Sequence, residues 1–570
     1  MSIPSADKDN VAIDPEATAD ADARVSITLD EEMRSLKKVS GPIPLNACLL
    51  CLAELVERLS FFGTSIVFTN FIQQPLSPLS GTGAGLADGQ SGALGLGQRA
   101  STAITTVFVL WCYITPLFGG YVGDAHLGRF KTIWMGIAIR LVGHVILIVA
   151  ALPGVIVNQS ASLGIFVTAL FFIGIGTGFF QSNIPPLLGE QCVAAYPEPV
   201  VKTIKGGERV VVDPGLTISK VFMYFYLTIN VGAVIGQISM TYCEKYVGYW
   251  LVYTATAVSF IICPLMLFFS RKRLVLLPPS GALLAKAARL CWSTAKRRWD
   301  PNPITTFRKL TAKEFWDDAK SAEAAVSPNG MQSSTSSDWI DEVKMTLGAC
   351  TVFVWFPIYW LTYNQINNNL TSQAATMTTN GIPNDVLNNL SPLLLIFLIP
   401  ICDLWVYPAI RNMGLEFGPL RKFFSGFMVG AVGMAWAAVV QHYVYATDPC
   451  GSHATTCRDP DGNSVVSPVN VWTQSGCYIL IAISEILAAV TGIEYAFTKA
   501  PKSMRSLVTG LFLLTSALSA ALGEAFVSLS SDPLLVWNYA VMAVLSAITG
   551  VAFWICVVRV NDRDEEKPLH

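Results

Sequence analysis

Charged residues are scarce in this chain. Asp, Glu, Lys and Arg make up 14% of its 570 residues, whereas hydrophobic residues make up 52%. Soluble domains carry about 25% charged residues, so the composition indicates that water is not the main solvent. The formal net charge is only −2, and the chain lacks the basic excess with which nucleic-acid-binding proteins neutralise phosphates. We therefore expect no nucleic acid partner.

Motifs of catalysis and metal binding are lacking as well. The sequence holds no P-loop of the GxxxxGK[ST] type, and no HExxH or GxSxG motif where its chemistry could operate. Its 13 cysteines do not show the paired CxxC spacing of zinc sites, and most lie in apolar runs where a thiol behaves as a small hydrophobe. We expect no enzymatic activity, no metal site and no cofactor. Cys450 and Cys457 lie in the same segment, 445–470. A disulfide between them and two free thiols are both compatible with the sequence.

Long hydrophobic runs are what the sequence has in abundance. Twelve runs are long enough to cross a bilayer core of ~30 Å, at residues 45–72, 100–122, 131–152, 163–188, 218–240, 247–269, 344–365, 387–409, 421–444, 471–497, 504–527 and 535–558. We predict an all-α membrane protein in which two six-helix bundles, 45–269 and 344–558, are joined by a hydrophilic linker, 270–343. Residues 1–44 are polar and acidic and are predicted to be a disordered tail, and 559–570 form a second tail.

The basic residues predict how the chain is oriented. Loops on one side carry nearly all of them, namely Arg129, Lys131, Lys202, Lys205, Arg209, Arg411, Arg421, Lys422, Lys499, Lys502 and Arg505, together with the linker. The other side holds only Lys245 and Arg458, with Arg99 at an edge. Positive residues stay on the cytoplasmic side of short loops. Both tails and the linker are therefore predicted to be cytoplasmic, and we expect the protein to lie in the plasma membrane.

Three charges lie inside the first hydrophobic run. A charge in a membrane helix costs on the order of 2.5–3.5 kcal/mol, so it usually faces a bundle interior and serves an ion or substrate path. Glu54 can reach Glu57 and Arg58 across one helical turn. We expect these two carboxylates to compete for one guanidinium and to hold a proton between them, although a fixed interhelical ion pair is the alternative.

Glu485 is the deepest charge of the tenth run. A carboxylate near the middle of a transporter is suited to hold an ammonium group or a proton, whereas Glu494, beside Lys499, is explained by an interfacial ion pair. Arg140 and His144 lie four residues apart in the third run. Their placement is compatible with side chains that face the bundle interior and equally with a snorkelling or structural role.

Four motifs in the same order resemble those of the proton-coupled oligopeptide transporters, a family within the major facilitator superfamily. Glu54-Leu-Val-Glu57-Arg58-Leu-Ser-Phe-Phe-Gly63 is similar to the ExxERFxYYG signature of the first helix. The segments 116–131, 225–232 and 484–501 resemble the signatures of the loop between helices two and three, of helix five and of helix ten. The resemblance covers about residues 45–558, and phrases such as Phe356-Pro-Ile-Tyr-Trp360 look most like the fungal branch.

The resemblance implies a major facilitator fold of about twelve transmembrane helices around a central cavity, and symport of di- and tripeptides with protons by alternating access. It implies proton coupling through Glu54, Glu57 and Arg58, and gating through Asp124 and Arg129. The residues implied to bind the substrate are Glu485, which would hold the amino terminus of the peptide, and Phe62, Tyr113, Gln181, Asn230, Trp360, Asn364 and Ser391.

Several of these positions depart from the family's pattern. Gln181 stands where the fourth helix usually carries a lysine, Ser65 where many members have an arginine, and Phe61 and Phe62 replace a tyrosine pair. Asn364 lies near a glutamate of other branches, and Ser391 takes the place of an asparagine.

The missing cations share one consequence. Desolvating the carboxylate of a peptide without a cation costs several kcal/mol, and Arg58 is the main positive group left, unless Lys220 compensates. We therefore expect weakened carboxylate recognition. One alternative to peptide import is a related carrier of a modified peptide, nitrate or a secondary metabolite, working inward or outward. A second alternative is a nutrient sensor that does not transport, with the acidic tail and the basic linker as its signalling surfaces.

Overall fold

The computed structural model describes residues 36–76, 80–85, 91–203, 207–279, 289, 292–300, 305, 314–326, 335–366, 369–378, 389–414, 417–457, 466–526, 529 and 532–558. The chain is almost entirely helical over these ranges. Residues 1–35 of the predicted N-terminal tail and 559–570 of the C-terminal tail lie outside the described residues, as do Lys205, Arg458 and most of 280–313 in the linker.

Eleven helical segments in the described part of the chain are long and apolar enough to cross a membrane. They match the second to twelfth predicted runs. The first run forms helix α2 (Leu45–Ser65), whose 21 residues span about 30 Å. Its Glu54, Glu57 and Arg58 explain why α2 is less apolar than the other spans.

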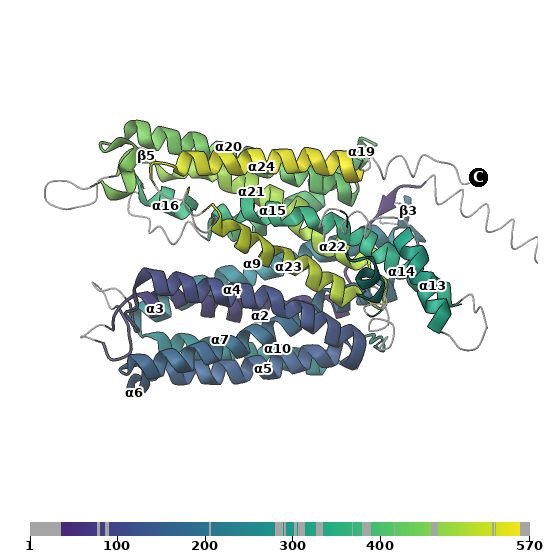
Figure 1. Cartoon of the computed structure of the whole chain (residues 1–570), viewed down its shortest axis with the longest axis horizontal. Coiled ribbons are helices and arrows are strands. Elements are labelled where there is room, and N and C mark those ends of the chain that lie inside the picture. The colour runs from purple at the N-terminus through teal and green to yellow at the C-terminus, as the bar shows by residue number, and fades with distance from the viewer. Residues whose placement is uncertain are drawn as a thin grey trace, which may run out of the picture.

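The first half of the chain forms one group of packed helices. Besides α2, it consists of α3 (Phe68–Gln73), α4 (Gly97–Val122) with the π-helical turn η1 (Gly123–Leu127), α5 (Arg129–Ala150), α6 (Pro153–Ile156), α7 (Gln159–Gln181), α8 (Ile184–Ala195), α9 (Pro214–Tyr246) and α10 (Tyr249–Ser270). Figure 1 shows α2, α4, α5, α7 and α10 in the lower layer of the molecule.

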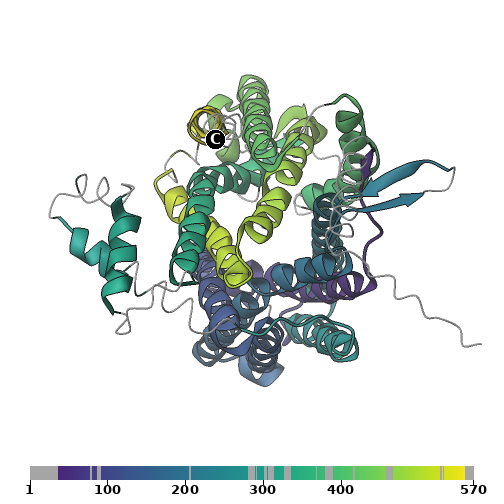
Figure 2. The same cartoon turned by 90° about the vertical axis from the view of Figure 1, so that its right-hand side faces the viewer.

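The second half forms the other layer, and most of its spans are broken into shorter helical pieces. The pieces are α14 (Thr335–Cys350), η2 (Thr351–Trp355), α15 (Phe356–Tyr363), η3 (Asn364–Ile366), α16 (Asn369–Ala375), α18 (Leu390–Ile401), η4 (Cys402–Val406), α19 (Tyr407–Asn412), α20 (Pro419–Thr447), η5 (Gly451–Thr456), η6 (Val471–Gln474), α21 (Ser475–Glu485), η7 (Ile486–Val490), α22 (Thr491–Lys499), α23 (Arg505–Glu524), α24 (Leu535–Phe553) and η9 (Trp554–Val558). Viewed end-on in Figure 2, helices of both halves surround one central axis.

Small residues bring α2 and α9 into close contact. A Cβ on Gly232 would collide with the carbonyl oxygen of Leu55, and one on Gly236 would collide with that of Leu59. Backbones of membrane helices approach this closely only through such residues. The contact fixes the turn of α2 that carries the three charges, and it directs that turn toward the middle of the bundle.

The two ends of the helix bundle carry different strands and short helices. At one end, which we call the sheet end, β1 (Lys38–Val39), β3 (Arg209–Val212) and β2 (Val200–Thr203) form a small sheet in the order β1-β3-β2. The linker helix α13 (Glu314–Val326) lies at the same end (Figure 1). At the opposite end, β4 (Met377–Thr378) pairs with β5 (Ser467–Asn470).

The strand β1 lies within the segment predicted to be disordered. It pairs in parallel with β3, because the amide groups of Val211 and Asp213 donate to the carbonyl oxygens of Lys37 and Val39 at 3.0 Å each. The expectation of disorder therefore fails for Lys38–Val39. Composition missed the strand because its partner is more than 170 residues away in the sequence.

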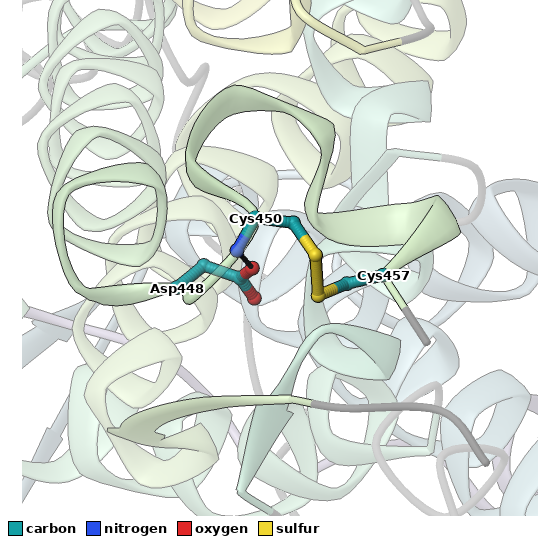
Figure 3. A group of neighbouring side chains, drawn as sticks. All are labelled: Asp448, Cys450 and Cys457. Atoms are coloured by element: carbon teal, nitrogen blue, oxygen red, sulfur yellow. Dashed lines mark hydrogen bonds between the residues drawn. A yellow bond between two sulfur atoms is a disulfide. The ribbon is translucent and has the colours of Figure 1, made fainter. Parts of the chain in front are cut away.

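Cys450 and Cys457 form a disulfide, which settles the question that the sequence left open (Figure 3). Their Cα atoms are 5.6 Å apart, within the usual range for a disulfide. Asp448 accepts a hydrogen bond from the amide of Cys450 at 2.8 Å. These three residues are a possible metal-ligating group in the described chain, but both sulfur atoms are used in the disulfide. We call this end of the bundle the disulfide end.

Candidate functional site

A buried cavity of about 280 Å³ lies between the two halves. Glu54 and Arg58 line it, and so does every residue that the resemblance implied for substrate binding: Phe62, Tyr113, Gln181, Asn230, Trp360, Asn364, Ser391 and Glu485. Residues that are 431 positions apart in the sequence, Glu54 and Glu485, thus face one space. The fold brings the predicted set together, while the individual roles remain predictions.

The charges of α2 form a buried network with a second arginine. Arg58 Nε lies 3.1 Å from Glu54 Oε1 and also contacts the carboxylate of Glu57. Glu57 is fully buried and pairs with Arg140 of α5 as well. Both carboxylates contact Arg58 as predicted, but the network also holds a second guanidinium, which the prediction did not include. Arg140, whose role the sequence left open, is an interior residue that is only 1% exposed.

The two carboxylates of this network have different surroundings. Glu57 binds a guanidinium with each of its oxygens. Glu54 binds Arg58 with Oε1, whereas its Oε2 is buried and meets no hydrogen-bond partner among the described residues. Because Glu54 lines the cavity and has an oxygen to spare, it is the carboxylate of this pair that can take up a proton without breaking two ion pairs.

Gln181 faces the same arginine. With its amide oxygen turned toward Arg58, it accepts from Nη2 at 2.6 Å and from Nη1 at 2.5 Å. The guanidinium is then occupied by Glu54, Glu57 and Gln181. Lys220, considered as a replacement cation, lies elsewhere, 4.0 Å from Asp403 of η4, and does not line the cavity.

Glu485 supplies the negative charge of the opposite wall. It ends α21, directly before the π-helical turn η7, and is 2% exposed. The hydroxyl of Tyr226 in α9 donates to its Oε1, while its Oε2 is buried without a partner in the described chain. A buried acceptor without a donor is costly, so this oxygen is suited to a cationic ligand group.

Uncharged residues complete the walls. The indole of Trp360 donates to Thr515 Oγ1 at 3.0 Å, which fixes its ring. Asn230 donates to the carbonyl of Tyr226 at 2.9 Å, and Ser391 Oγ is buried with no partner among the described residues. Sequence reasoning missed Tyr226, although it lies in the fifth-helix motif directly after Phe225.

Asp124 and Arg129 tie the two halves together at the sheet end. They lie 2.9 Å apart, and Gly128, with a φ of 78°, makes the turn between η1 and α5 that brings them together. Arg129 donates to Ser506 Oγ at 2.8 Å and to the carbonyl of Lys502 at 2.7 Å, both in the second half. Asp124 accepts from the amide of Leu507 at 2.9 Å.

Two further acidic residues strengthen this closure. Glu190 of α8, which sequence reasoning missed, pairs with Arg129 and lies 3.8 Å from Arg505. Glu494 accepts from Ser219 of α9 instead of pairing with Lys499, so the prediction of an interfacial pair is wrong. The cavity is therefore closed off from the sheet end by contacts between the halves.

Apolar spans in two halves around a charged cavity are the architecture of a membrane transport protein. The profile of the POT family matches residues 130–544. The chain is 38% identical to the peptide transporter PTR_C of Candidozyma auris, over 94% of this chain and 88% of that protein. It is 36% identical to the peptide transporter PTR2 of Saccharomyces cerevisiae, over 94% and 83%, and to the MFS-type transporter ucsM of an Acremonium species, over 93% and 86%. The chain belongs to the POT family.

Solved structures share the fold. The crystal structure of the POT family transporter PepTSo superposes with a TM-score of 0.58, covering 92% of this chain and 100% of that one at 20% identity. A POT family transporter in complex with 5-aminolevulinic acid superposes with a TM-score of 0.58 over 91% and 97%, at 16% identity. The predicted all-α transporter fold and the resemblance to this family are confirmed.

Proposed function

We propose that the protein carries di- and tripeptides across the membrane together with protons, by alternating access. The observation that carries this proposal is that Glu485, with a free oxygen, and the Glu54–Arg58 pair line one buried cavity from opposite halves of the chain. A peptide zwitterion needs an anion for its ammonium group and a cation for its carboxylate. The cavity supplies both at its two sides, and the relatives named as peptide transporters support the assignment.

The coupling step follows from the unequal surroundings of the two carboxylates of α2. Protonation of Glu54 removes its charge next to Arg58 and frees that guanidinium for the carboxylate of a peptide. Glu57 keeps its place through Arg140, so it positions Arg58 while Glu54 exchanges the proton. Asp124 and Arg129 act as the gate, because opening the sheet end requires their hydrogen bonds to the second half to break.

Uptake into proteoliposomes tests the proposal. The purified protein is reconstituted, and a labelled dipeptide is supplied with and without an inward proton gradient. We expect accumulation that depends on the gradient and is inhibited by unlabelled tripeptide. A folded protein that shows no uptake under either condition would refute peptide transport. Binding of the dipeptide without any flux would instead identify a sensor.

The sheet end is proposed to face the cytoplasm and the disulfide end the outside of the plasma membrane. The basic loop residues gather at the sheet end, as the positive-inside rule requires, and a disulfide persists in an oxidising compartment.

We expect Cys450 and Cys457 to react with a membrane-impermeant maleimide in intact cells only after an impermeant reductant has opened the disulfide. The Cys450→Ser/Cys457→Ser variant supplies the background, and Lys296→Cys, in the linker, should react only after permeabilisation. The reverse pattern would place the disulfide end in the cytoplasm.

A second candidate function rests on Gln181. Because its amide oxygen and the two carboxylates of α2 occupy Arg58, a substrate without a free carboxylate would lose little in this cavity. A carrier of modified peptides or of other small metabolites fits this feature.

Gln181→Lys should separate the two functions. The lysine removes an acceptor from Arg58 and adds a cation, so we expect the preference for a dipeptide over its C-terminal amide to rise by about tenfold, because a charge-assisted hydrogen bond contributes about 1.5–3 kcal/mol. Competition by the two compounds for labelled dipeptide uptake measures this preference. Gln181→Met, which only removes the amide, is the matched control. An unchanged preference in Gln181→Lys would show that this position does not contact the carboxylate.

A further inference from the structure

A second cleft, of about 830 Å³, lies at the sheet end and is separate from the central cavity. One wall comes from the first half of the chain: the tail segment Lys37–Ser40 and the start of α9. The other wall comes from the second half: η4, α19, the start of α20, and α22. In Figure 2, which faces this end, the purple strand β1 lies along β3 beside helices of the second half.

Residues that line the cleft also form polar contacts between the halves. Ser219 donates to Glu494, and Lys220 lies 4.0 Å from Asp403. The third acidic residue of the lining, Asp213, caps α9 by accepting from the amides of Gly215 and Leu216 at 2.7 and 3.2 Å. Each carboxylate of the cleft therefore already has a partner.

Four cations of the cleft have no such partner. Lys37 and Lys38 come from the tail, and Arg411 and Lys422 come from the second half. None of them forms an ion pair among the described residues, although Lys422 lies over the ring of Tyr407 at 4.8 Å. Cations gathered from two walls around a cleft without a free carboxylate create a site for an anion with several charges.

The surroundings of the cleft indicate how such an anion would arrive. Leu404 and Trp405 of η4 are 61% and 72% exposed beside it, on a helical segment apolar enough to cross the membrane. Exposed apolar side chains of this kind face lipid, and basic pockets at the cytoplasmic ends of membrane helices bind phosphorylated headgroups. Lysines supply point charges, and the arginine supplies a planar fork for phosphate oxygens.

We propose that this cleft binds the phosphate-bearing headgroup of an anionic lipid of the cytoplasmic leaflet. The headgroup is held by Lys37 and Lys38 of the tail on one side and by Arg411 and Lys422 on the other. Because these two pairs belong to different halves, a bound headgroup bridges the halves above the contacts that close the sheet end. The pairing of β1 with β3 holds the tail lysines in place, so β1 positions two cations of the site in addition to anchoring the chain.

Binding to the full-length purified protein in an uncharged detergent tests the site independently of transport. The probe is dioctanoyl phosphatidylinositol 4,5-bisphosphate, and dioctanoyl phosphatidylcholine is the zwitterionic control. We expect saturable binding of the bisphosphate lipid alone. Lys37→Ala/Lys38→Ala and Arg411→Ala/Lys422→Ala should each weaken it by about tenfold or more, since each variant removes two of the four cations that hold the headgroup.

Matched variants and soluble ligands make the result decisive. Lys296→Ala/Arg297→Ala removes two exposed cations of the linker and should leave the affinity unchanged. Thermal unfolding of all variants confirms that they fold. Equal affinity for inositol 1,4,5-trisphosphate would support the anion site and assign it to soluble phosphate compounds. Undiminished binding in both cleft variants, or no binding by the wild type, would overturn the proposal.

Discussion

Arg140→Met is expected to destabilise the protein by about 3–5 kcal/mol, because it leaves two buried carboxylates, Glu54 and Glu57, with the single guanidinium of Arg58. Arg140 is 1% exposed and Glu57 is fully buried, and the two form an ion pair between α5 and α2. The guanidinium also lies over the ring of Phe260 at 4.5 Å. Methionine keeps most of the volume but supplies neither charge nor donors. Equilibrium unfolding of the purified protein in mixed micelles measures the loss.

A second substitution shows whether the ion pair is the cause. Glu57→Gln/Arg140→Met removes both charges and should recover much of the stability, since no uncompensated ion remains. Arg297→Met, in the exposed part of the linker, should leave the free energy of unfolding unchanged. Equal losses in Arg140→Met and in the double variant would mean that Arg140 stabilises the bundle through packing and not through Glu57.

This ion pair shows the limit of what the sequence predicts. The twelve spans are predictable because each must satisfy its backbone within one hydrophobic run, and a local motif predicts that Glu54, Glu57 and Arg58 belong together. Glu57 and Arg140, however, are 83 residues apart. Whether they meet depends on the rotation of α5 about its axis, which tertiary packing decides. The sequence therefore leaves the second guanidinium undetermined.

The candidate site also contains residues that the sequence predicts and residues that only the fold identifies. Glu54, Arg58, Phe62, Asn230 and Glu485 could be assigned by motif, because each motif places side chains on a helix whose position the resemblance implies. The other predicted lining residues lie outside the four motifs and follow from the overall resemblance. Tyr226 lies in the fifth-helix motif, which assigned it no role, and Glu190 lies outside the four motifs. Both residues are recognised through the carboxylate and the arginine that they contact. The role of Gln181 also changes with its surroundings. In the sequence, Gln181 is notable because a cation is missing at its position. In the fold, its amide oxygen is a hydrogen-bond acceptor for Arg58.

Glu485→Gln is expected to lower the kcat/KM of dipeptide uptake by about 100-fold, because truncating a buried charge that pairs with a ligand costs 2–5 kcal/mol. The amide has the same shape as the carboxylate but no charge for the ammonium group of a peptide. Glu244→Gln is the matched control, since Glu244 is equally buried, at 3% exposure, and does not line the cavity. Its uptake should stay within about twofold of the wild type. The kcat/KM of Tyr226→Phe should lie between those of Glu485→Gln and Glu244→Gln, because this substitution removes one hydrogen bond to Glu485 and keeps the charge.

Comparison with an N-acetylated dipeptide assigns the loss to the ammonium group. The wild type should discriminate against the acetylated compound about as strongly as the substitution lowers uptake of the free dipeptide. In Glu485→Gln this discrimination should largely disappear, since neither compound then meets a charge. If the variant still discriminates, the ammonium group is bound elsewhere in the cavity, and the free oxygen of Glu485 serves the proton instead.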